Sequence, residues 1–144
     1  MDKVAAIKQK MWENDHFSQW LGLDIQELDA TGYCKLQYTV RKDMLNGFGT
    51  IQGGALFSAA DTAFAFACNV AGDVTVALDV SISFLKPAHE GDVLTVEARK
   101  MHQGRKTGLY EVKTFNAKNE LISFFKGTCY VTGKSILDTE DDKN

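Results

Sequence analysis

The chain has little of what marks secreted or metal-binding proteins. Its 144 residues include three cysteines, which stand far apart without a Cys-x-x-Cys pair or a cluster with histidine. The sequence therefore has no metal-ligand spacing, and we expect no metal and no redox cofactor. The cysteines are expected to be reduced, mostly buried thiols, as in a cytoplasmic protein. Residues 1–14 carry charges where a secretory signal needs an apolar core, which argues against export.

Long hydrophobic runs and basic runs are also missing. The longest apolar stretch runs from Ala55 to Ala71, with Asp61 near its centre, and it is shorter than the ~20 residues that a membrane span needs. Lys and Arg number 16 against 19 Asp and Glu, and the formal net charge is -3. This balance gives no electrostatic basis for binding nucleic acid or an anionic membrane, so neither is expected as a partner.

What is present fits one globular domain. Hydrophobic residues make up 44% of the chain and charged residues 24%, which is typical of an ordinary folded domain. We find no linker, no internal repeat and no low-complexity segment. We therefore expect a single domain over residues 1–134. The acidic stretch 135–144 is expected to be a disordered tail.

The periodicity of apolar residues changes along the chain. It has helical spacing up to Gly22, alternates with a period of two in residues 33–40, and returns to a helix at residues 52–70. From Val74 onward, alternating segments are separated by hairpin-length turns, and in the first of them the apolar side chains of residues 74–84 are expected on one face. The pattern predicts an α+β fold in which a curved antiparallel sheet of about six strands wraps around one long central helix.

Asp61 is the unusual residue of that central helix, because a carboxylate among apolar neighbours is costly to bury. The helix opens with Gly53-Gly54 after a glycine-rich loop. The first N–H groups of a helix lack internal acceptors, and the helix dipole adds partial positive charge there. Such a helix start can bind an oxyanion. Alternatively, the two glycines only let the helix begin close to a strand.

Asp61 lies seven residues after Gly54. Seven residues make nearly two turns, so both positions share one stripe of the helix, about 10 Å apart along its axis. A nucleophile must come within ~3–3.5 Å of a carbonyl carbon, so the acid and its own helix start do not easily serve one carbonyl. Two antiparallel copies of the helix would bring each Asp61 to the glycines of the other chain. The spacing therefore favours a two-fold dimer with two shared sites.

The string Asn46-x-x-Gly49-x-x-Gln52-Gly53-Gly54, then Asp61-Thr62 and a strand ending in SISFLKPA, resembles the hotdog-fold acyl-CoA thioesterases. The most similar group is the phenylacetate-pathway type, within the uncharacterised possible thioesterase family. The resemblance extends from about Phe17 to Thr132. It implies hydrolysis of acyl-CoA to free acid and coenzyme A, in a homodimer that commonly pairs into a homotetramer, with no cofactor beyond the coenzyme A of the substrate.

The resemblance also implies a role for each matching residue. Asp61 is the carboxylate that acts as nucleophile or as general base, and the Gly53 N–H polarises the thioester carbonyl across the dimer interface. Asn46 orients the thioester end or the water, and Thr62 holds Asp61 by a hydrogen bond. The remaining expected site residues are Gln52 beside the glycines, Gly54 as a second N–H donor, and the cations Lys86, Arg105 and Lys106, which are candidates for the coenzyme A phosphates.

Two departures from the family pattern are visible. Gln52 stands where histidine is most common, and Ala77 stands where some relatives place a serine that holds the water. Glutamine donates a hydrogen bond but supplies no proton, which argues against a hotdog dehydratase. A non-catalytic acyl-CoA-binding domain remains the main alternative, and acyl-carrier protein is a possible carrier in place of coenzyme A.

Overall fold

The computed structural model describes residues 2–137 of the chain. Its elements are α1 (Lys3–Glu13), α2 (His16–Leu21), β1 (Asp24–Asp29), β2 (Tyr33–Thr39), the 3-10 turn η1 (Lys42–Met44), α3 (Gly53–Asn69), β3 (Asp73–Phe84), β4 (Val93–Gln103), β5 (Thr107–Phe115) and β6 (Leu121–Ser135). The helices and strands expected from periodicity are thus present in the expected order.

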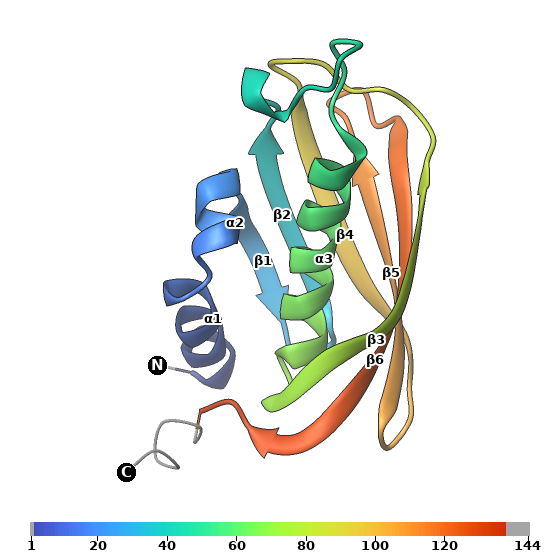
Figure 1. Ribbon diagram of the computed structural model, residues 1–144. Coiled ribbons are helices and arrows are strands. Elements are labelled where there is room, and N and C mark those ends of the chain that lie inside the picture. The colour runs from blue at the N-terminus through green and yellow to red at the C-terminus, as the bar shows by residue number, and fades with distance from the viewer. Residues whose placement is uncertain (1, 138–144) are drawn as a thin grey trace.

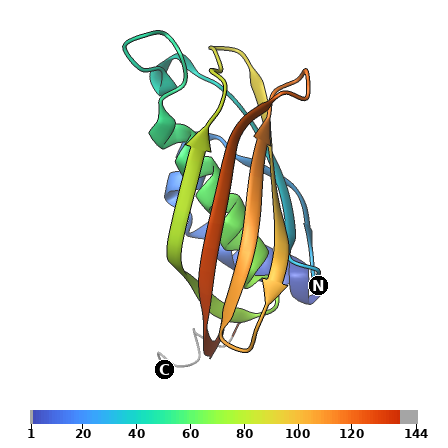
Figure 2. The same ribbon diagram turned by 90° about the vertical axis from the view of Figure 1, so that its right-hand side faces the viewer.

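The six strands form one antiparallel sheet in the order β1-β2-β4-β5-β6-β3. Figure 1 shows α3 lying along one face of this sheet, with α1 and α2 beside it. Figure 2 shows the opposite face, on which the strands are not covered by a helix. β1 and β3 are the edge strands. The arrangement agrees with the expected curved sheet around one central helix.

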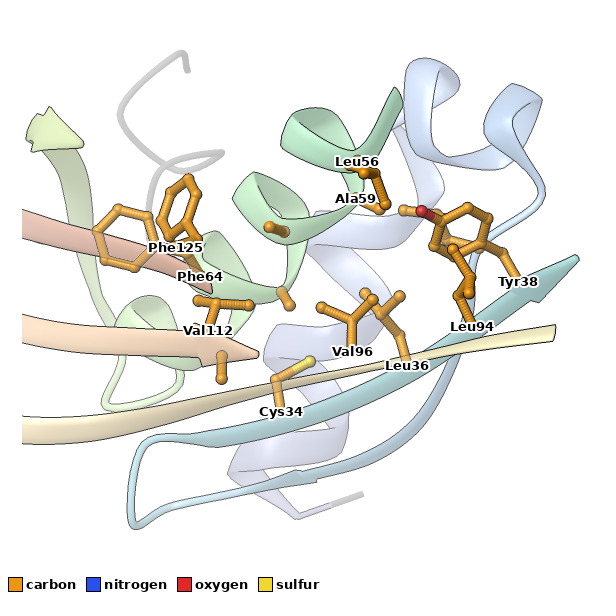
Figure 3. Packing of buried hydrophobic residues seen from close by; sticks show 14 of the residues in the cluster. Cys34, Leu36, Tyr38, Leu56, Ala59, Phe64, Leu94, Val96, Val112 and Phe125 are labelled. Carbon is orange, nitrogen blue, oxygen red and sulfur yellow. The ribbon is translucent and has the colours of Figure 1, made fainter. Parts of the chain in front are cut away.

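The core lies between α3 and the sheet. Cys34 and Leu36 of β2 and Val96 of β4 point into this core (Figure 3). Phe64 of α3 packs on Phe125 of β6, with ring centroids 5.6 Å apart. All three cysteines are free and buried, as expected. The apolar character of α3 on most of its surface follows from this burial against all six strands, α1 and α2.

Polar caps set the ends of α3. At the start, the Gln52 side-chain oxygen accepts a hydrogen bond from the Gly54 N–H at 2.7 Å. At the end, the buried Asn69 side chain donates to the carbonyls of Ala65 and Thr75 and accepts from the Thr75 N–H at 2.7 Å. Asn69 therefore joins the last turn of α3 to the first residues of β3, which fixes where that edge strand begins.

β3 differs from the simple alternation expected for it. Register shifts between Asp73 and Thr75 and between Ala77 and Asp79 are β-bulges against β6. A bulge moves the following side chains to the other face. As a result Val76 and Leu78 are exposed, whereas Val80 packs against the core. The expectation that all apolar side chains of this strand share one face is wrong for that reason.

The chain remains ordered beyond residue 134. Ser135 ends β6, and Ile136 is buried with its N–H bonded to the Gly72 carbonyl at 2.7 Å. Ser135 and Ile136, which the sequence placed in the expected tail, are therefore part of the folded structure. The acidic residues 138–144 lie outside the part of the chain that the structure describes.

Candidate active site

A cavity of about 510 Å³ lies at the N-terminal end of α3, and it brings together three of the expected site residues. Asn46 from the loop after η1, Gly53 from the first turn of α3 and Lys86 from the segment after β3 all line it. The Phe84 ring lies so close to Gly53 that a Cβ added there would be 3.0 Å from its Cζ. A side chain at position 53 would therefore press on the Phe84 ring, and the Gly53 backbone lines the cavity.

At the start of α3, the backbone N–H of Gly53 differs from the N–H groups of the next three residues. Ala55 and Leu56 donate to the Gln52 carbonyl, and Gly54 donates to the Gln52 side chain. Among residues 2–137, the structure records no acceptor for the Gly53 N–H. An unpaired N–H at the positive end of a helix can stabilise a developing oxyanion. The geometry thus supports Gly53, and not Gly54, as the free donor.

Asn46 shapes the loop that borders the same cavity. Its side-chain oxygen accepts from the N–H groups of Phe48 and Thr50, and its amide nitrogen donates to the Thr50 hydroxyl at 3.0 Å. Its backbone N–H and carbonyl also bond within the loop, to Thr50 and Gly49. Asn46 therefore has a structural reason to be present, whatever it also contributes toward a ligand.

Asp61 is half-buried on the least buried stripe of α3, which also carries Gly54, Ser58 and Ala65. Burial raises the pKa of its carboxyl group above the usual value. No hydrogen bond or ion pair reaches this carboxylate from any residue between 2 and 137 in the structure. The group does not line the cavity at Gly53, and eight residues of helix place it about 12 Å from Gly53 along the axis.

Thr62 is turned away from Asp61. Its hydroxyl lies 2.8 Å from the hydroxyl of Ser18 on α2, and both side chains are buried. The expected hydrogen bond from Thr62 to Asp61 is therefore not formed in this structure, because the Thr62 hydroxyl contacts Ser18. Ser18 was not foreseen from the sequence, since nothing in its local pattern indicates a partner 44 residues away.

The expected phosphate-binding cations fall at opposite ends of the fold. Lys86 lines the cavity at Gly53 and forms an ion pair of 2.6 Å with Glu120. Hydrogen bonds from Lys86 and Asn116 lower the pKa of the Glu120 carboxyl group. Arg105 and Lys106 lie in the turn between β4 and β5, where Arg105 lines a smaller cavity at the C-terminal end of α3. Within one chain they do not share the Lys86 site.

A second cavity, of about 400 Å³, lies beside the first turn of α3 and is lined by Gln52, Gly54 and Ser58 together with residues of α2. Over residues 2–137 no group of three or more His, Cys, Asp or Glu side chains is arranged to hold a metal ion. In the same part of the chain, no helix combines the length and the apolar character that crossing a membrane requires.

Comparison with known proteins adds family evidence to this geometry. Residues 48–123 match the family model described as the thioesterase superfamily. The chain is 42% identical over 126 residues to the acyl-coenzyme A thioesterase PaaI of Escherichia coli, covering 88% of this chain and 89% of that relative.

Two solved structures extend the likeness to the fold. The E. coli PaaI protein from the phenylacetic acid degradation operon matches with a TM-score of 0.89 and 40% identity, over 92% of this chain and 96% of that one. A hypothetical thioesterase protein of Streptococcus pneumoniae, solved with coenzyme A, matches with a TM-score of 0.75 and 29% identity, over 78% of this chain and 90% of that one.

Proposed function

Because the chain belongs to the thioesterase superfamily and has its hotdog fold, we propose that it is an acyl-CoA thioesterase that uses the Gly53 N–H and the Asp61 carboxylate. The observation that carries the proposal is the free Gly53 N–H at the mouth of a cavity of about 510 Å³ at the start of α3. Coenzyme A is present with the related S. pneumoniae protein, which supports a coenzyme A thioester as the substrate here.

The reaction needs few groups because a thioester has a good leaving group. The Gly53 N–H holds the carbonyl oxygen as it gains negative charge. Asp61 either takes a proton from the attacking water or attacks the carbonyl carbon itself. In both routes the C–S bond breaks, and coenzyme A leaves as a thiolate that is then protonated. With Asp61 as the base, water supplies the second oxygen of the free acid. With Asp61 as the nucleophile, water hydrolyses the mixed anhydride, and attack at the Asp61 carbonyl leaves the original Asp61 oxygen on the acid and the water oxygen on Asp61. A single turnover in ¹⁸O-water labels Asp61 only if it is the nucleophile.

We place the two groups of one site on two chains. Gly53 and Asp61 lie ~12 Å apart along α3, which is too far for both to act on one thioester carbonyl. An antiparallel partner helix would instead present its Asp61 to Gly53. The exposed Val76 and Leu78 on the edge strand β3 support such pairing, because an edge with apolar side chains favours association. The proposed unit is a homodimer, which the family resemblance extends to a homotetramer.

Lys86 is the proposed contact for coenzyme A phosphate, since it is the cation that lines the Gly53 cavity. Arg105 and Lys106 would reach a phosphate only if another chain brings their turn to the site. Gln52 acts here through its hydrogen bond to the Gly54 N–H, which holds the start of α3 in shape. The three free thiols support a reducing, cytoplasmic location.

Release of free thiol from a panel of acyl-CoAs tests the function. The wild type should turn over, and Asp61→Asn, which keeps the shape and removes the charge, should lose orders of magnitude in kcat. Asp24→Asn, at an exposed carboxylate on β1, is the matched control and should behave as wild type. Saturable acyl-CoA binding without turnover in all three would establish the alternative, a non-catalytic acyl-CoA-binding domain. Acyl-carrier-protein thioesters in the same panel identify the carrier.

A further inference from the structure

Two aromatic side chains of α2 are exposed beside the candidate site. Phe17 is 54% exposed and Trp20 is 62% exposed, and their ring centroids lie 5.8 Å apart. The pair is held in place, because the Arg41 guanidinium lies 5.5 Å from the centre of the Trp20 ring and donates to the Leu21 carbonyl at 3.0 Å. Two exposed aromatic rings that lie side by side make this surface a candidate for binding an apolar group.

The pair forms one wall of the second cavity, of about 400 Å³. Leu21 and Met44, both buried, line it between α2 and η1. The first turns of α3 form the opposite wall through Gly54 and Ser58. The Ser58 hydroxyl donates to the Gly54 carbonyl at 2.8 Å, so its proton is already used within the helix. The cavity therefore offers mostly apolar surface to a ligand.

The two cavities flank the start of α3 and differ in charge. The cavity at Gly53 has the cation Lys86 in its wall. The aromatic cavity has Asp43 as its one ionisable lining residue among those that the structure describes, and Asp43 is paired with Arg41 at 3.0 Å. A phosphate-bearing chain is therefore favoured in the first cavity. An uncharged apolar group is favoured in the second.

Resting on the proposed function, we propose that the aromatic cavity binds the apolar acyl group of the thioester, with Phe17 and Trp20 as the residues that select acyl groups larger than acetyl. Gly54, next to the Gly53 donor, lies in its wall, so a carbonyl held at Gly53 has its acyl side next to this cavity. Ser58, which lines this cavity, and Asp61 share one stripe of α3. The α3 helix of an antiparallel partner would therefore place the Asp61 of that chain beside this cavity.

The test compares acetyl-CoA with hexanoyl-CoA and phenylacetyl-CoA in wild type, Phe17→Ala and Trp20→Ala. We expect kcat/KM for the two larger substrates to fall at least tenfold, while the value for acetyl-CoA changes less than twofold. Phe17→Leu should recover most of the loss. Phe48→Ala is the control, because Phe48 is 94% exposed on the loop after η1 and lines neither cavity. Equal losses on all three substrates, or no loss, would overturn the proposal.

A binding measurement distinguishes failure of the cavity assignment from failure of the proposed function. If the wild type hydrolyses none of the substrates, calorimetry compares hexanoyl-CoA with coenzyme A alone. A tighter Kd for hexanoyl-CoA that disappears in Phe17→Ala then supports the cavity assignment in a protein that is not an enzyme, and an unchanged difference overturns it. Light scattering reports the oligomer mass of each variant. A mass change in Phe17→Ala or Trp20→Ala would make the pair an interface between chains and overturn the assignment.

Discussion

The hydroxyl groups of Ser18 and Thr62 lie 2.8 Å apart in the buried contact between α2 and α3. This single hydrogen bond joins the helix that carries Phe17 and Trp20 to the helix that carries Asp61, at the residue directly after the acid. The proposed acyl-binding wall and the proposed reactive carboxylate are therefore linked through this contact.

Removing either hydroxyl should weaken this contact. Ser18→Ala or Thr62→Val leaves the other hydroxyl buried without its partner, which costs about 1–3 kcal/mol in the free energy of unfolding. The double variant leaves no unpaired hydroxyl, so its loss should be smaller than the sum of the two. Urea denaturation of the four proteins measures this coupling. Strictly additive losses would mean that the two hydroxyls do not interact in solution.

Asp61 should make stability depend on pH. Burial raises its pKa in the folded protein, so the folded state holds the proton more tightly than the unfolded state. Its contribution is fully present below the unfolded pKa of about 4 and is lost as pH rises through the raised folded value. Asp61→Asn should therefore become more stable than wild type as pH rises to neutrality. Denaturation at several pH values checks this, with Asp24→Asn as control, and a constant difference would contradict it.

Gly53→Ala should cause a steric conflict with Phe84. The added Cβ would lie 3.0 Å from the Phe84 Cζ and within 3.4 Å of two further ring atoms. We expect a loss of about 1–3 kcal/mol in the free energy of unfolding, as for other overpacked sites. Phe84→Leu in the same chain should recover part of that loss by making room. If the double variant is as unstable as the two single losses combined, the contact is not the cause.

Substitutions of Lys86 and of Glu120 should change KM for an acyl-CoA in opposite directions. Lys86→Ala removes the cation of the Gly53 cavity, so KM for an acyl-CoA should rise about two- to fivefold, and the effect should shrink at high salt. Glu120→Gln removes the carboxylate that competes for the Lys86 ammonium, so KM should fall. Lys106→Ala is the comparison at the far end of the sheet. A rise in KM for Lys106→Ala alone would move the phosphate contact to that turn.

The sequence by itself determined the elements and the local arrangement on α3. Apolar spacing along residues 52–70 predicted the helix that runs from Gly53 to Asn69, because helix periodicity is a local property. The same spacing placed Asp61 on the stripe of Gly54, and the family string from Asn46 to Asp61 indicated the fold that the comparisons confirm. These inferences depended only on residues that are close together in the chain.

Only the tertiary structure decided which distant residues meet. Thr62 was expected to bond Asp61 but contacts Ser18, and Lys86 lies at the start of α3 while Arg105 lies near its other end. The bulges of β3, which expose Val76 and Leu78, arise from its pairing with β6. Such contacts join segments that are tens of residues apart in the chain. Their energies depend on how the segments pack together, which the local spacing of apolar residues in either segment does not indicate.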